Sequence, residues 1–269
     1  MQRRTIRAAA AALLAALAGT AVAQGQPPSS DFGWNASAGV LHRRLVERAD
    51  DGSRLLEESG PMLRLALEGQ VRLSGGGAVQ AGIAVAGGEL DYEGRTQAGL
   101  PLATDSRHRD IDFTLAWRPL PAARWGEGWL VLRALQHRRS IASTPTAGGL
   151  RETSSLLLPG VRWTHGFDAA GWRWRPSLEL RASAHHRLEI DYGGVFDDSR
   201  IRGGRRWEAA LGVEASAPDS PWRWGIAWTH VRQSASARQA LYRAGVAAGT
   251  VRQPRIDIDD ISLTLRRAF

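Results

Sequence analysis

The segment 172–192, WRWRPSLELRASAHHRLEIDY, alternates between apolar and polar residues along its length. One set of alternate positions holds Trp172, Trp174, Pro176, Leu178, Leu180, Ala182 and Ala184. The other set holds Arg173, Arg175, Ser177, Glu179, Arg181, Ser183, His185, Arg187, Glu189 and Asp191. A β-strand turns successive side chains to opposite faces, whereas a surface helix repeats every 3.6 residues. The segment therefore predicts one long strand with an apolar face and a charged face.

Similar segments recur along the chain and predict ten strands. They lie at 33–48, 54–73, 78–93, 106–120, 128–141, 152–165, 172–192, 199–216, 222–236 and 252–269, with the weakest alternation in 33–48, 128–141 and 152–165. Long alternating strands are typical of membrane barrels, in which one face meets lipid and the other meets the lumen. Since every backbone amide in hydrocarbon needs a partner, the sheet must close. The sequence predicts an all-β, closed antiparallel up-and-down transmembrane β-barrel over residues 33–269.

The connections between these segments fall into two classes. Those at 74–77, 121–127, 167–171 and 217–221 are short and rich in turn residues, and those at 94–105, 142–151, 193–198 and 237–251 are mostly longer. Short turns of bacterial barrels face the periplasm, and aromatic girdles mark the lipid interfaces. The tryptophans near the short turns predict a periplasmic girdle of Trp34, Trp117, Trp129, Trp163, Trp172, Trp174, Trp222 and Trp224.

The first 23 residues have the pattern of a cleaved signal peptide. Arg3, Arg4 and Arg7 precede the apolar run 8–18, and small residues follow up to Ala23. Residues 24–32 are then a periplasmic N-terminal segment. The chain has no cysteine, which excludes a disulfide framework and a thiolate metal site. We expect export to the outer membrane of the cell.

Charged residues on the non-lipid faces predict an ionic network inside the barrel. Its predicted members are Arg64, Glu68, Arg72, Asp110, Asp112, Arg118, Arg175, Glu179, Arg181, Arg206, Glu208 and Glu214. Enclosed charges need opposite partners and hydrogen bonds. The near balance of signs predicts a plugged or narrow lumen instead of a wide pore.

The segment 104–112 gathers acids, a histidine and arginines near the outer rim. Asp105 or Asp110 could orient His108 as a general base, with His185 on the opposite side, so these four residues are the candidates for catalysis. A solvated, salt-bridged loop explains the same residues. His185 and His186 are adjacent on a strand and point to opposite faces, so we expect no metal site there. No cofactor motif is present.

The last nine residues, ISLTLRRAF, alternate and end in Phe269. This ending resembles the C-terminal signal that the barrel insertion machinery reads in outer-membrane barrels, although Arg267 departs from the usual apolar residue. Ten strands, charged rims and Thr104–His108 also resemble the omptins, which are outer-membrane aspartyl-type proteases. That family pairs two nearby aspartates with an Asp-x-His, and this chain has no Asp-x-His. The resemblance therefore implies barrel size and loop order without the protease pattern.

Three functional hypotheses remain open from the sequence. The first is a non-enzymatic envelope barrel whose loops contact surface ligands, outer-membrane lipid or lipopolysaccharide. The second is a hydrolase at the outer rim, acting on peptide or lipid, and the third is a narrow channel for small solutes. All 35 basic residues are arginine and are spread along the chain, so no nucleic-acid surface is indicated. The sequence leaves the oligomeric state open.

Overall fold

The computed structural model describes residues 32–95, 100–145 and 148–269, and the predicted signal peptide lies outside these ranges. All regular structure in the described residues is β-strand: β1 Phe32–Arg48, β2 Arg54–Arg72, β3 Ala78–Arg95, β4 Pro101–Arg118, β5 Glu127–Ile141, β6 Leu150–Thr164, β7 Phe167–Ala169, β8 Trp172–Ser183, β9 Arg187–Asp191, β10 Ser199–Arg202, β11 Arg206–Ser216, β12 Trp222–Gln233, β13 Gln239–Arg243, β14 Val246–Val251 and β15 Arg255–Ala268. No helix in this part of the chain has the length and apolar character needed to cross a bilayer.

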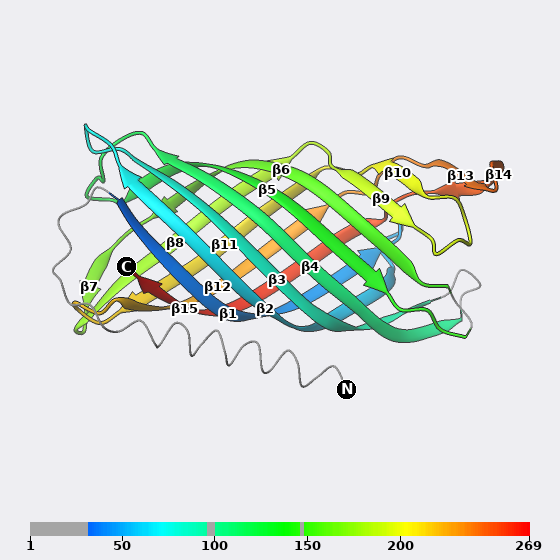
Figure 1. The fold of residues 1–269 in the computed structure, drawn as a ribbon, viewed down its shortest axis with the longest axis horizontal. Coiled ribbons are helices and arrows are strands. Elements are labelled where there is room, and N and C mark those ends of the chain that lie inside the picture. Colours follow the sequence, from blue (N-terminus) through cyan, green and yellow to red (C-terminus); the bar gives the residue numbers. More distant parts are fainter. Residues whose placement is uncertain (1–31, 96–99, 146–147) are drawn as a thin grey trace. The chain divides into compact units, whose positions relative to one another are not determined.

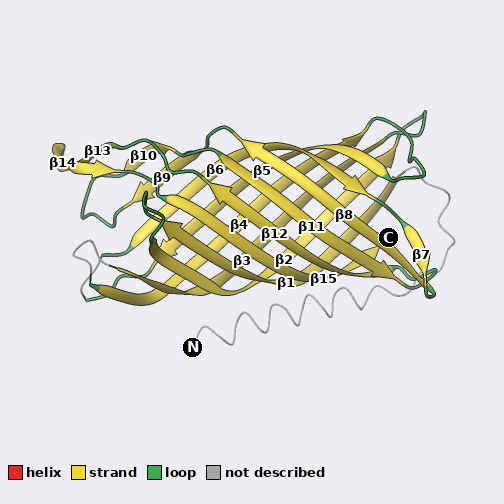
Figure 2. Cartoon of the chain, turned by 180° about the vertical axis from the view of Figure 1, so that it is seen from behind, coloured by secondary structure: helices red, strands yellow, loops and turns green. Residues whose placement is uncertain are grey.

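The sheet closes into a barrel with neighbouring strands antiparallel (Figures 1 and 2). Strand β1 pairs with β2 on one side and with β15 on the other, where Asn35 lies opposite Ala268. Strands β8 and β9 both pair with β6 and together form one wall strand, and β10 and β11 together form the next. The wall thus has ten strands, as predicted. Strand β7 extends a turn beside β8, and β13–β14 is a separate hairpin.

Most predicted strand boundaries agree with the structure within a few residues, and the three weakly alternating segments are full strands. The largest difference at a strand end is in β4, which begins at Pro101 instead of residue 106. One end of the barrel carries Phe269 and four short turns, and we call it the short-turn end. The turns are at 73–77, 119–126, 165–171 and 217–221. The opposite end is the long-loop end.

The outer wall carries an apolar band beside the short-turn end. Large apolar side chains there are exposed, among them Val40, Leu67, Phe113, Leu132, Leu157, Leu180, Leu211, Ile226 and Leu263. Exposure of so much apolar surface is costly in water and favourable in hydrocarbon. Toward the long-loop end the next outward residues are polar on most of the wall strands, for example Arg109 beyond Ile111 and Asp259 beyond Ile261. The membrane-spanning segments are the strand parts that carry this band.

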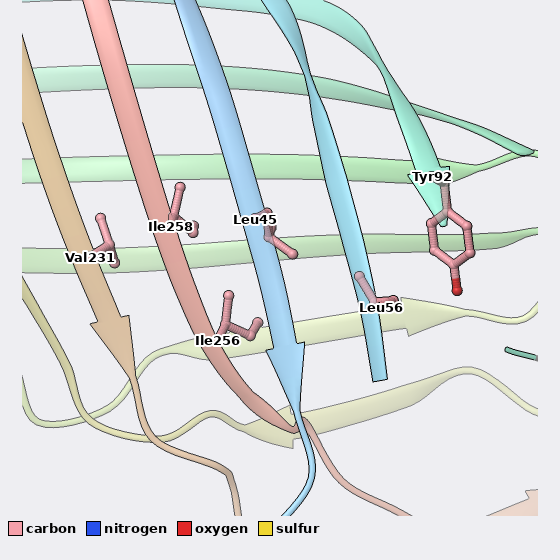
Figure 3. Packing of buried hydrophobic residues seen from close by; sticks show 6 residues of the cluster. All are labelled: Leu45, Leu56, Tyr92, Val231, Ile256 and Ile258. Carbon is pink, nitrogen blue, oxygen red and sulfur yellow. The ribbon is translucent and has the colours of Figure 1, made fainter. Parts of the chain in front are cut away.

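Beyond the band the polarity of the wall is inverted. The outside is charged, whereas the inside holds the buried cluster Leu45, Leu56, Tyr92, Val231, Ile256 and Ile258 (Figure 3). Two more buried clusters lie closer to the short-turn end, and we call these two the apolar plug. One contains Leu41, Met62, Ala86 and Leu90, and the other contains Leu135, Leu156 and Leu158. The long-loop half is therefore packed like a water-soluble β-barrel, with apolar side chains inside.

Strands β8 and β9 show how the chain makes this change. The even-numbered residues of 172–190 are apolar except His186, and they face outward in β8 and inward in β9. Leu188 and Ile190 are 1% and 4% exposed. Residues 184–186 interrupt the strand, and 203–205 interrupt the neighbouring one at the same level, where Gly203 N donates to His186 O over 2.8 Å. The prediction of one unbroken strand with Arg187, Glu189 and Asp191 on the lumen face is therefore wrong.

Most of the predicted girdle tryptophans lie on the outer wall near the short turns. Trp34, Trp117, Trp163, Trp172 and Trp224 are exposed, and Trp174 and Trp222 are partly buried. Trp129 does not belong to this ring, because it is 3% exposed and packs inside the barrel against Ala78, Ala116 and Val131. It lies on the same face of β5 as Arg133, and the guanidinium of Arg118 lies 5.4 Å from its ring centre. The girdle prediction is wrong at this residue.

Candidate functional site

The lumen beside the apolar band holds an extensive set of ion pairs. The strands that carry apolar residues outward carry these charges inward, because successive side chains of a strand alternate between faces. Its members, which we call the lumen network, are Arg43, Arg64, Arg118, Arg133, Arg162, Arg175, Arg181, Arg206, Arg223 and Arg266 with Glu68, Asp110, Asp112, Glu127, Glu179, Glu208, Glu214 and Asp260. Every predicted member is in this set except Arg72, which is exposed at the end of β2.

The acids of the lumen network are shared between arginines. Glu208 pairs with Arg206 at 2.5 Å, with Arg181 at 3.0 Å and with Arg133 at 3.1 Å. Its side chain has no exposed surface. A single carboxylate has room for several charge-assisted hydrogen bonds. The sharing joins strands that are far apart in the sequence across the inside of the barrel.

Arg43 and Asp260 are central members that the sequence did not identify. Arg43 Nη2 lies 2.9 Å from Asp110 Oδ2 and 2.8 Å from Asp260 Oδ2. His137 Nδ1 lies 2.5 Å from the other oxygen of Asp110. Arg43 and His137 lie in strands whose alternation was weak, and this weakness concealed them. Each shares its inward face with an apolar residue, Leu41 or Leu135, so neither strand has a uniformly polar face in the sequence.

A second ionic group lies inside the barrel on the long-loop side of the apolar band, and we call it the Arg139 cluster. Arg139 pairs with Glu58 and Glu47 at 2.5 Å each and with Glu152 at 3.0 Å. The other oxygen of Glu58 lies 2.5 Å from His108 Nε2. The Glu58 and His108 side chains have no exposed surface. Buried charges of this kind are stable only when their partners are close and their hydrogen bonds are made.

Burial and neighbouring charges set the protonation of this cluster. Burial lowers the pKa of His108 to about 4, which leaves its imidazole neutral at pH 7. Burial also disfavours the charged form of Glu58, but Arg139 and the hydrogen bond with His108 outweigh it and lower the Glu58 pKa to about 2. A neutral His108 therefore donates its Nε2 proton to an ionised Glu58. Burial raises the pKa of Glu47 to about 7 against the effect of Arg139.

The four candidate catalytic residues do not form one group. Asp105 lies in the outward phase of β4 opposite Asp91, while His108 and Asp110 point inward. His185 is exposed in the interruption between β8 and β9, where its Nδ1 lies 3.2 Å from Arg202 Nη2. The acid beside His108 is Glu58, and no solvent reaches the pair. The prediction that Asp105 or Asp110 orients His108 is therefore wrong, because Glu58 holds the imidazole and Asp110 is bound by Arg43 and His137.

His185 and His186 lie in the interruption between β8 and β9 and differ in exposure. His186 is 3% exposed and burial lowers its pKa to about 4, whereas His185 is exposed. Within residues 32–95, 100–145 and 148–269, no group of three or more histidine or acidic side chains has a metal-binding arrangement.

Solvent access to the lumen comes from the short-turn end. The Arg64 and Arg175 side chains are 32% and 35% exposed, while Arg139 is 3% exposed and Glu58 is fully enclosed. The lumen network surrounds a cavity of about 350 Å³ that reaches Arg175 and Arg266. The apolar plug and the Arg139 cluster lie between this cavity and the long loops. The lumen is thus open on one side and filled on the other.

No protein-family model matches the chain. No curated protein matches it either. The described barrel is similar to the crystal structure of outer membrane protease OmpT from Escherichia coli, with a TM-score of 0.56 and 10% identity over 91% of this chain and 99% of that chain. The chain has the fold of a bacterial outer-membrane β-barrel. At this identity the likeness concerns the fold alone.

Two further barrels are similar at lower scores. The β domain of the Bordetella autotransporter BrkA has a TM-score of 0.46 at 12% identity, covering 88% of this chain and 100% of that chain. The translocator domain of autotransporter NalP from Neisseria meningitidis has a TM-score of 0.45 at 10% identity, covering 99% and 98%. The closed ten-strand sheet and the likeness to OmpT confirm the predicted barrel class.

Proposed function

We propose that this outer-membrane barrel is a non-conducting, non-enzymatic envelope protein that binds anionic headgroups of the outer leaflet and holds its long loops above the lipid. The observation that carries the proposal is the inverted polarity of the long-loop half. A barrel that only crossed the membrane would need no charged outer wall beyond the apolar band, and an open channel would need no apolar plug. Both features fit a stalk that stands in water on a membrane base.

One arginine pair marks the headgroup level. Arg109 on β4 lies directly opposite Arg138 on β5, and both are exposed on the outer wall one step beyond Ile111. Like charges directly opposite on neighbouring strands are destabilising. No described residue forms an ion pair with either arginine, and their outer neighbours Gly87 and Thr153 are uncharged. An anion between the two guanidinium groups would remove the repulsion.

Phosphate suits this position because a guanidinium binds it through two parallel hydrogen bonds. In the outer leaflet the abundant phosphates at this depth belong to lipopolysaccharide. Arg107, two residues from Arg109, is only loosely held by Glu89 at 3.5 Å and adds a third cation. We therefore assign the outer-leaflet partner to the phosphates of lipid A.

A lipid-binding assay in nanodiscs tests the lipid contact. The folded barrel is reconstituted in phosphatidylcholine nanodiscs, and binding of lipid A is followed by titration. Changing Arg109→Gln together with Arg138→Gln is expected to weaken binding at least about tenfold, which corresponds to about 1.4 kcal/mol. The control is Arg173→Gln, an exposed arginine at the short-turn end. Equal affinity of the double variant and the control would contradict the assignment.

Planar bilayer recording tests the closed lumen independently. Insertion is first verified by protection of the barrel from protease, and current is then measured in neutral salt. We expect no stepwise conductance, because the apolar plug and the Arg139 cluster fill the lumen. Regular single-channel steps from verified protein would favour the narrow channel over the closed barrel.

A further inference from the structure

The cavity inside the lumen network has a mixed lining. Small residues such as Ser37, Ala66, Gly82 and Gly212 are interspersed with charged residues such as Arg64, Arg162 and Arg181. The small residues leave about 350 Å³ that the charged side chains do not fill. Pockets for small organic ligands begin at about 300 Å³. The space is therefore large enough for a small solute as well as for water.

The charges around this cavity are not balanced. Its lining contains seven arginines, Arg43, Arg64, Arg133, Arg162, Arg175, Arg181 and Arg266, and six acids, Glu68, Asp110, Asp112, Glu179, Glu214 and Asp260. Toward the mouth, Arg175 shares Glu127 with Arg118, and Arg266 shares Glu214 with Arg223. Enclosed cations that outnumber their partners attract an anion.

Two partly exposed arginines of the cavity are loosely paired. Arg64 reaches Asp112 at 3.3 Å, and Arg266 reaches Glu68 at 3.4 Å. Other pairs in the same lumen are shorter, such as Arg162 with Glu179 at 2.6 Å. Loosely paired guanidinium groups keep donors that a ligand can use, and the spacing of those donors matches carboxylate and phosphate oxygens.

We infer that the cavity is a binding site for a small organic anion carrying carboxylate or phosphate groups, which enters from the short-turn end. Arg64, Arg175 and Arg266 bind the anion, and the small residues between the charged side chains leave room for its uncharged part. In the orientation usual for bacterial barrels the short turns face the periplasm, so the ligand is a periplasmic solute. The inference does not depend on the outer-leaflet contact or on the absence of conductance.

Calorimetric titration of the full-length mature barrel in detergent tests this site. The probes are citrate and pyrophosphate, each titrated at constant ionic strength set with sodium chloride. We expect saturable binding with one anion per barrel for at least one probe. Absence of saturable binding for both probes, or heats that follow ionic strength alone, would overturn the inference.

Two substitutions with opposite expected effects on affinity, one removing a cation and one removing a carboxylate, separate binding from general damage to the barrel. Arg175→Gln removes a cation at the mouth and is expected to weaken binding at least about tenfold, because a charge-assisted hydrogen bond contributes more than about 1.4 kcal/mol. Glu214→Gln removes a competing carboxylate and is expected to strengthen binding several-fold. Arg200→Gln, far away at the long-loop end and 75% exposed, is the matched control with unchanged affinity. Weakening by both Arg175→Gln and Glu214→Gln, or by neither, would contradict the site.

Discussion

His108 Nε2 lies 2.5 Å from Glu58 Oε2, although the two residues are 50 positions apart in the chain and neither side chain has exposed surface. The contact joins β2 to β4 across the width of β3, through the inside of the barrel. Arg139 binds the second oxygen of the same carboxylate. These contacts link the stability of the long-loop half to the protonation state of His108.

The His108–Glu58 contact predicts a pH dependence that a single substitution should remove. The pKa of His108 is about 4 in the folded barrel and about 6.5 in the unfolded chain. Between these values only the unfolded chain binds the proton, so the free energy of unfolding falls by about 1.4 kcal/mol per pH unit as pH decreases. His108→Gln keeps a donor for Glu58 but does not titrate.

We therefore expect the stability of His108→Gln relative to the native chain to rise as pH falls from 6.5 to 4. Denaturant unfolding in lipid vesicles at pH 8, 6 and 5 measures this difference. The comparison between the two proteins cancels the opposite contribution of Glu47, whose pKa is raised to about 7. Parallel stability profiles for the two proteins would show that His108 does not titrate as argued.

Removal of Arg139 should be among the most destabilising changes to a charged side chain. Arg139→Leu leaves Glu47, Glu58 and Glu152 without their shared cation in a buried place, and breaking such a pair costs about 3–5 kcal/mol. The exposed pair of Arg44 with Glu57 is the comparison, since Arg44→Leu should cost less than about 1 kcal/mol. Denaturant unfolding gives both values. Similar losses for the two variants would refute the structural role of the cluster.

The aromatic contact at the end of the chain should stabilise closure of the barrel. Phe269 stacks on Trp34 with ring centres 4.0 Å apart and planes at 7°, and Phe269 N donates to Trp34 O over 2.9 Å. Phe269→Ala should reduce the free energy of unfolding by about 0.5–1.5 kcal/mol through loss of the stack. If the insertion machinery also reads Phe269, the rate of folding in its presence should fall more than the rate into bare vesicles. Equal slowing in both systems would leave the stack as the whole effect.

Gly203 should tolerate no side chain while His186 is present. A Cβ at residue 203 would overlap the imidazole of His186, which is 3% exposed and cannot move into solvent. Gly203→Ala should cost about 1–3 kcal/mol, as overpacking usually does. His186→Ala in the same chain should recover much of that loss, and Gly33→Ala, with open space around it, should change little. Additive losses in the double variant would show that the two residues do not meet.

Much of the lumen network could be predicted because alternation assigns each strand residue to a face. Glu179, Arg181 and Glu208 were identified in this way and pair inside the barrel. Arg43, Arg133 and Asp260 were missed, since apolar residues such as Leu41, Leu135 and Ile258 share their inward face. A strand that faces lumen charges at one end and the apolar interior at the other has no uniform polar face to detect.

By itself the sequence determined the number of strands, their order and the side that meets lipid, because a period of two is a local property of the backbone. Tertiary structure decided the rest: that Leu188 faces inward after the interruption at 184–186, that Trp129 packs inside, and that Glu58 is the partner of His108. A local interruption reverses every later face of a strand, and contacts across a barrel depend on the stagger with which it closes. Neither the place of such an interruption nor the stagger of the closed barrel is encoded in the alternation of one strand.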